Sequence, residues 1–177
     1  MPGSFSIYNS DILSTINDLK IKTIFDVGIG KGKFFNLTKN INIERYGCEI
    51  DSSYINKYKL NIKYKKIFNE DYLQLIRNNK IDIFPVDMII FSDVIEHFLH
   101  SEVYNALDYS LYNCQYIIVI NPIFSIQNKY IDENGNHESE IHKSKIKLTD
   151  LCFKYNIITY KNIKHKNIDY CFYLISN

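Results

Sequence analysis

The stretch TIFDVGIGKGK, residues 23–33, decides the fold of this chain. A β-branched and apolar run ends in three glycines at alternating positions, and residues 33–40 have a helical pattern. This order predicts a strand, a tight turn that can approach a ligand closely, and a helix whose first N–H groups are free. The spacing D-x-G-x-G-x-G is no dinucleotide fingerprint, because Lys33 takes the third glycine position, and Phe34 breaks a P-loop that starts at Gly28.

Strands and helices are expected to alternate on both sides of this stretch. The expected strands are 22–27, 43–50, 64–68, 86–91 and 115–120, and the expected helices include 8–19, 53–60, 72–78, 102–112 and 148–155. Such alternation predicts a parallel sheet with helices on both faces. Two last runs, 157–164 and 168–175, are too close together for a crossover helix and predict an antiparallel hairpin. The expected fold is therefore α/β, a three-layer sandwich with a seven-strand, mostly parallel sheet and a C-terminal antiparallel hairpin.

Composition and charge exclude several classes of protein. The 177 residues, 46% hydrophobic and 23% charged, fit one globular domain over residues 1–177 and argue against disorder. The net charge of +1 gives no overall field for nucleic acid or a membrane surface. No apolar run approaches the ~20 residues of a membrane span, and no signal-peptide pattern is expected. The four cysteines form no C-x-x-C pair, which favours free thiols in a cytoplasmic protein.

Acidic residues follow the next strands in a recurring order. Glu49 ends the second strand in YGCEID (46–51), Asp71 follows the third, and DMIIFSDVIEHF (87–98) contains the fourth. Together with the glycine turn, these motifs make the chain, from about residue 8 to about 175, resemble the class I S-adenosylmethionine (SAM) dependent methyltransferases. The resemblance implies their fold, SAM as cofactor and methyl transfer as activity.

The resemblance also implies a cofactor site. Glu49 would bind both ribose hydroxyls, since a carboxylate accepts two hydrogen bonds, unless it is only a solvated strand-end charge. Asp71 would face the adenine amino group or merely cap the following helix. Asp26 would organise the turn or meet the methionine amino group through water. The full set of expected cofactor-binding residues is Asp26, Gly28, Gly30, Gly32, Glu49, Ile50, Asp71, Tyr72 and Ser92. The alternative for the glycines is a tight turn alone.

Candidate catalytic residues are His97 and His142. If a helix begins where the fourth strand ends, Asp93, Glu96 and His97 share one of its faces. Two branches of the family, the small-RNA 3′-terminal 2′-O-methyltransferases and the ubiquinone-pathway O-methyltransferases, have a similar set that holds a divalent metal together with a later histidine. Here the matching set is Asp93, Glu96, His97 and His142, suited to Mg²⁺ or Mn²⁺. The chain departs from these branches, because Asp93 is shorter than their glutamate and Ile146 replaces a common aromatic residue. In the alternative, Glu96 and His97 line the acceptor pocket.

The polar segment 121–147 is expected to form a lid over the ends of the strands. Its first residues, 121–123, predict either a contact with the acceptor or a turn forced by Pro122. No large substrate domain is expected, which favours a small-molecule acceptor, a sugar, or a terminal hydroxyl or amine. One alternative is a metal-dependent RNA 3′-terminal 2′-O-methyltransferase, although the lysine-rich run 57–66 is better explained as a solvated face. The other is a non-catalytic SAM-binding partner or regulatory subunit.

Overall fold

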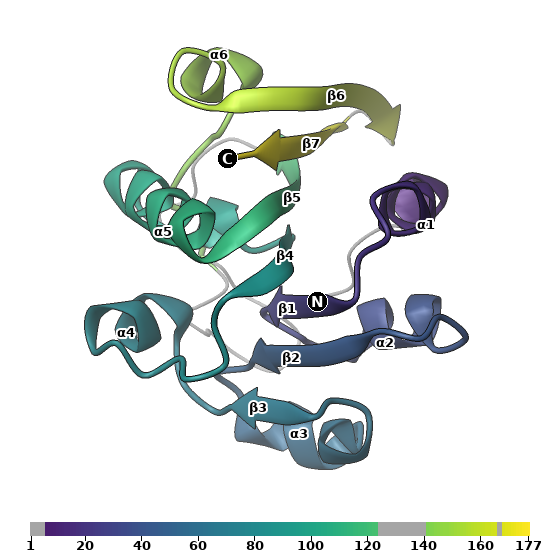
Figure 1. Cartoon of the computed structure of the whole chain (residues 1–177). Helices are drawn as coiled ribbons and strands as arrows, with labels where there is room; N and C mark the ends of the chain where they lie inside the picture. Colours follow the sequence, from purple (N-terminus) through teal and green to yellow (C-terminus); the bar gives the residue numbers. More distant parts are fainter. Residues whose placement is uncertain (1–5, 124–140, 166–167) are drawn as a thin grey trace.

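Seven strands form a single sheet in the order β3-β2-β1-β4-β5-β7-β6. The computed structural model describes residues 6–123, 141–165 and 168–177 (Figure 1). The strands are β1 (Thr23–Val27), β2 (Glu44–Cys48), β3 (Lys66–Phe68), β4 (Val86–Ser92), β5 (Cys114–Ile123), β6 (Asn156–His165) and β7 (Ile168–Ser176). The pairs among β1 to β5 are parallel, whereas β7 is antiparallel to both β5 and β6. The expected α/β fold and its closing hairpin are confirmed.

Helices cover both faces of this sheet, as expected for a three-layer sandwich. The α-helices are α1 (Asn9–Asp18), α2 (Lys33–Thr38), α3 (Ser52–Lys57), α4 (Tyr72–Arg77), α5 (His100–Asn113) and α6 (Leu148–Leu151), and the 3-10 helices are η1 (Ser6–Tyr8), η2 (Leu60–Ile62) and η3 (Ile95–His97). Figure 1 shows α1 and α2 on one face and α4 and α5 on the other. No helix in the described part of the chain is both long and apolar enough to cross a bilayer.

The side chains of β4 alternate between two apolar cores. Met88 and Ile90 pack with residues of α1 and α2, whereas Ile89 and Phe91 pack with residues of α4 and α5. All four are at most 1% exposed. Their continuous apolar run is typical of a central parallel strand, which is buried on both faces. This strand therefore fixes Ser92 and the residues after it against both layers.

Two expectations near the C-terminal half were wrong. The expected helix 148–155 ends at Leu151. Of the two alternatives for 121–123, the turn at Pro122 does not form, because β5 continues to Ile123 and Pro122 pairs with Tyr170 of β7, whereas the contact with the acceptor stays a prediction. The Ile120 carbonyl points toward β4 and accepts a hydrogen bond from the Asp93 N–H. Backbone groups two residues apart on a strand point to the same side, so the Pro122 nitrogen also points toward β4, but beyond the last β4 residue that pairs with β5. A strand can hold proline where no neighbour needs its N–H.

Much of the expected lid, 124–140, lies outside the described residues. Its first part, 121–123, belongs to β5. Its last part is bound to η3, where Lys143 N–H and Ser144 N–H donate to the Glu96 carbonyl at 2.7 and 3.1 Å. The lid therefore remains a prediction, with an anchored C-terminal end beside η3.

Candidate functional site

The glycine turn between β1 and α2 has the left-handed backbone that glycine adopts without strain. Gly28, Gly30 and Gly32 have φ of +69°, +55° and +76°. Two reasons exclude a side chain at Gly28. Its φ of +69° is unfavourable for other residues, and an added Cβ would lie 2.7 Å from Val94 Cγ2. Gly28 N–H also donates to the Cys48 carbonyl at 3.0 Å. The turn is thus held between the ends of β2 and β4.

Glu49, which follows β2, binds this turn through a hydrogen bond to its side chain. Its side chain is buried, with Oε2 accepting from Gly30 N–H at 2.7 Å and Oε1 accepting from Asp51 N–H at 2.9 Å. Because each carboxylate oxygen has two lone pairs, these bonds leave capacity for further donors. Glu49 is therefore not a freely solvated strand-end charge, and its expected contact with ribose hydroxyls remains a prediction.

Residues expected on the adenine side have structural partners of their own. Asp71 caps α4, with Oδ1 accepting from Gln74 N–H at 3.2 Å, so the capping role is confirmed and the adenine contact stays a prediction. The Tyr72 side chain is buried, and its hydroxyl lies 2.7 Å from Ser110 Oγ. Only the backbone of Tyr72 is therefore available to a cofactor. The Ile50 side chain is exposed.

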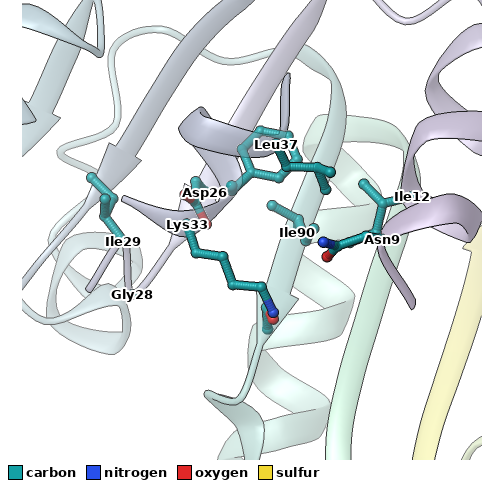
Figure 2. A pocket seen from close by; sticks show the side chains of 10 residues that line it. Asn9, Ile12, Asp26, Gly28, Ile29, Lys33, Leu37 and Ile90 are labelled. Atoms are coloured by element: carbon teal, nitrogen blue, oxygen red, sulfur yellow. The ribbon is translucent and has the colours of Figure 1, made fainter. Parts of the chain in front are cut away.

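A pocket of about 370 Å³, including its open mouth, lies beside the glycine turn (Figure 2). The pocket contains three expected cofactor residues, Asp26, Gly28 and Ser92. Its complete lining is Asn9, Ile12, Asp26, Gly28, Ile29, Lys33, Phe34, Leu37, Ile90 and Ser92.

Two polar residues of this pocket were missed by the sequence analysis. Lys33 begins α2, and burial lowers the pKa of its ammonium, an effect that nearby Asp93 partly opposes. Asn9 begins α1, and its Oδ1 is buried without a hydrogen-bond partner among the described residues. The Tyr8 hydroxyl donates to the Tyr170 carbonyl at 2.6 Å, which fixes the start of α1 over β7. Lys33 follows the glycines directly and could have been found, whereas Asn9 reaches the pocket only through tertiary packing.

Asp26 lines the pocket and is 3% exposed. The Tyr64 hydroxyl donates to Asp26 Oδ2 at 2.5 Å. Burial raises the pKa of Asp26 to about 7, the Tyr64 hydrogen bond lowers it, and the charge of Glu49 raises it further. The carboxyl therefore changes its charge near neutral pH, and only its ionised form can pair with a cationic ligand.

A second cluster forms where β4 ends. Glu96, His97 and His142 each offer one metal-ligating atom, and these atoms lie within 4.8 Å of one another. Asp93 is not part of this group. The expected helical face is wrong, because Asp93 turns the chain at φ +55° and a 3-10 helix over Ile95–His97 replaces the α-helix. Three of the four expected ligands are thus brought together.

His97 has a defined proton arrangement. Its Nδ1 lies 3.3 Å from the Ile141 carbonyl. A carbonyl oxygen can only accept, so Nδ1 carries the proton and Nε2 keeps its lone pair in the neutral ring. Burial lowers the pKa of His97, the bond to Ile141 raises it, and Lys143 lowers it. The imidazole is therefore suited to accept a proton or to bind a metal at neutral pH.

Solved structures of methyltransferases superpose on nearly the whole chain. M. capricolum TrmK in complex with S-adenosylhomocysteine (SAH) is 14% identical, with a TM-score of 0.63 over 98% of this chain and 69% of that one. The magnesium protoporphyrin IX methyltransferase of Synechocystis PCC 6803 with bound SAM is 12% identical, with a TM-score of 0.65 over 100% and 86%. The chain has the class I methyltransferase fold. A SAM dependent methyltransferase from Archaeoglobus fulgidus is also similar, at 16% identity and a TM-score of 0.60 over 96% and 94%.

This methyltransferase fold is evident from structure and not from sequence similarity. No family model and no curated protein matches the sequence. The glycine turn, Glu49 and the pocket all lie around the carboxyl ends of β1, β2 and β4. In open α/β sheets, ligands bind outside these strand ends, at the point where the strand order reverses.

Proposed function

We propose that this chain is a SAM-dependent methyltransferase. The observation that carries the proposal is the glycine turn, with three residues at positive φ, fastened through Gly30 N–H to the Glu49 carboxylate. The turn stands beside an open pocket, in a fold whose solved examples hold SAM or SAH. These features together support a cofactor that spans the ends of β1, β2 and β4.

The polar groups of the pocket suit the amino-acid end of SAM. Asp26 and Asn9 Oδ1 can accept from its ammonium, and Lys33 can pair with its carboxylate. Glu49 would then receive the ribose hydroxyls at the end of β2. Figure 2 supports this assignment, because Asn9, Asp26 and Lys33 surround one hollow.

Methyl transfer from a sulfonium mainly requires orientation, since the leaving group is good. An oxygen or nitrogen acceptor must also lose a proton, and His97 Nε2 is our candidate for the base. We propose a small-molecule acceptor, a sugar, or a terminal hydroxyl or amine. The fold itself does not choose among these, because one fold can serve many substrates.

Isothermal titration calorimetry with SAM tests the cofactor site. We expect binding in the micromolar range, about −8 kcal/mol, and a loss of at least ~10-fold in Glu49→Gln. Glu44→Gln is the matched control, because Glu44 begins the strand that Glu49 follows but pairs with Lys65 at the surface. Absence of binding to the wild-type protein at millimolar SAM would refute the proposal. Binding without transfer to any acceptor would favour the SAM-binding partner or regulatory subunit instead.

A metal-assisted reaction is the second candidate, and the convergence of Glu96, His97 and His142 favours it. One carboxylate and two imidazoles suit Mn²⁺, Fe²⁺ or Zn²⁺ better than Mg²⁺, which prefers oxygen ligands. When bound, such an ion would lower the pKa of an acceptor hydroxyl. This candidate includes the RNA 3′-terminal 2′-O-methyltransferases.

Calorimetry of Mn²⁺ with the protein alone tests the metal site without requiring activity. We expect saturable binding to the wild type and to His100→Ala, whose imidazole is half exposed on α5. His142→Ala should lose binding by ~10-fold or more, because a ligand is removed. Equal affinity of all three proteins would refute the metal site and leave His97 as a base.

A further inference from the structure

Asp26 and Tyr64 form a buried pair that the proposed reaction does not yet explain. Asp26 is the fourth residue of β1 and lines the pocket. Tyr64 lies between η2 and β3, is 4% exposed and does not line the pocket. Its hydroxyl donates to Asp26 Oδ2 at 2.5 Å. Tyr64 can therefore influence a ligand only through Asp26.

The charges around this pair leave Asp26 without a cationic partner. On β2 and just after it, Cys48 and Glu49 face Asp26, and burial keeps the Cys48 thiol neutral by raising its pKa. Lys33 of α2 shares the pocket. Arg45 of β2 acts on Tyr64. Within residues 6–123, 141–165 and 168–177, no ion pair joins Asp26 to any of these groups. Tyr64 is thus the side-chain donor that stabilises the ionised carboxyl.

We propose that Tyr64 is a positioning residue of the cofactor site, which favours the ionised form of Asp26 and directs its carboxyl so that it can receive the ammonium of the ligand. The inference rests on the proposed function. It makes cofactor binding depend on pH, because a protonated carboxyl cannot pair with an ammonium. Since burial raises the pKa of Asp26 to about 7, a large share of the protein without ligand is protonated at neutral pH.

The direction of the pH dependence follows from this pKa. Affinity should fall as the pH drops below about 7 and should level off above it, where Asp26 is already ionised. The hydrogen bond from Tyr64 favours the ionised form, so Tyr64→Phe should raise the midpoint of the affinity curve by about one pH unit. Affinity would then be ~10-fold lower at pH 6 and nearly unchanged at pH 8.5.

Calorimetric titration with SAH between pH 5.5 and 8.5 tests the proposal. SAH has the same ammonium group as SAM. Tyr58→Phe is the matched control, because Tyr58 caps the end of α3, packs on Tyr54 and on the same apolar cluster as Tyr64, and has no bond to Asp26. Asp26→Asn should give a nearly flat profile, and its residual slope corrects for histidines that titrate in the same range.

A merely structural role of Tyr64 would weaken binding by the same factor at every pH, and that result overturns the proposal. An unshifted midpoint in Tyr64→Phe does so as well. Absence of SAH binding to the wild type at any pH would instead refute the proposed function. In that case, ¹³C NMR titration of the Asp26 carboxyl in the protein alone still measures whether Tyr64→Phe raises its pKa. The same titration decides the matter if the variant proves too unstable for calorimetry.

Discussion

Substitution of Gly28 by alanine tests how the glycine turn is fixed against the residue after β4. Two costs add at this position. An L-residue at φ +69° costs about 1–2 kcal/mol, and the new Cβ would lie 2.7 Å from Val94 Cγ2, an overlap that costs about 1–3 kcal/mol. We therefore expect Gly28→Ala to lower the free energy of unfolding by about 2–5 kcal/mol, a large share of an ordinary domain's ~5–15 kcal/mol.

Two variants separate these costs. Gly30→Ala is the matched control, because its φ is +55° but its added Cβ would meet only the Gly28 carbonyl oxygen at 3.9 Å. It should lose about 1–2 kcal/mol. Val94→Ala should rescue part of the Gly28→Ala loss, giving a coupling of about 1–3 kcal/mol in the double-mutant cycle. Urea unfolding followed by circular dichroism measures the wild type, the three single variants and the Gly28→Ala/Val94→Ala double variant. Strict additivity, or equal losses in Gly28→Ala and Gly30→Ala, would refute the reasoning.

Two further results are expected from the titratable groups. The pKa of Asp26 is about 7 in the folded protein, whereas an aspartate of the unfolded chain loses its proton at about pH 4. The contribution of Asp26 to the free energy of unfolding should therefore fall by about 1.4 kcal/mol for each unit that the pH rises between 4 and 7. Urea unfolding across that range should show a flatter decline in Asp26→Asn, and parallel curves would contradict the burial argument. If His97 is the base, its lowered pKa should place the acid limb of the rate profile below pH 6.5, and a limb above that value would exclude His97 from this role.

Local patterns predicted most of the sheet. The continuous apolar run of β4 and the glycines after β1 are local signals, and the structure confirms both elements within a few residues. The end of β5 was not predictable in this way, because Pro122 continues the strand only through its distant partner Tyr170. The expected helix 148–155 failed for a related reason. Its apolar residue Phe153 is 92% exposed and does not belong to a buried face.

The candidate site was predictable where its residues follow the strands directly. Glu49 and the glycines lie together because the strands that carry them are neighbours. Asn9 and Tyr64 were missed, since one reaches the pocket from the helix before β1 and the other supports Asp26 from outside the pocket. Asp93 was wrongly expected to join Glu96 and His97 on one helical face. Its left-handed backbone conformation prevents an α-helix from beginning there, and a rule based on helical spacing cannot anticipate this.

The strand order has a consequence for how the protein is made. β1 pairs with β2 on one side, through Thr23 and Glu44, and with β4 on the other, through Ile24 and Met88. During synthesis, the first three strands can therefore associate while one edge of β1 stays bare, which is a hazard for aggregation. The pocket is incomplete until Ser92 has left the ribosome. A cofactor that binds this pocket would thus stabilise the completely folded domain by mass action. It could not assist the folding of the first half of the chain, because its binding site is not yet complete.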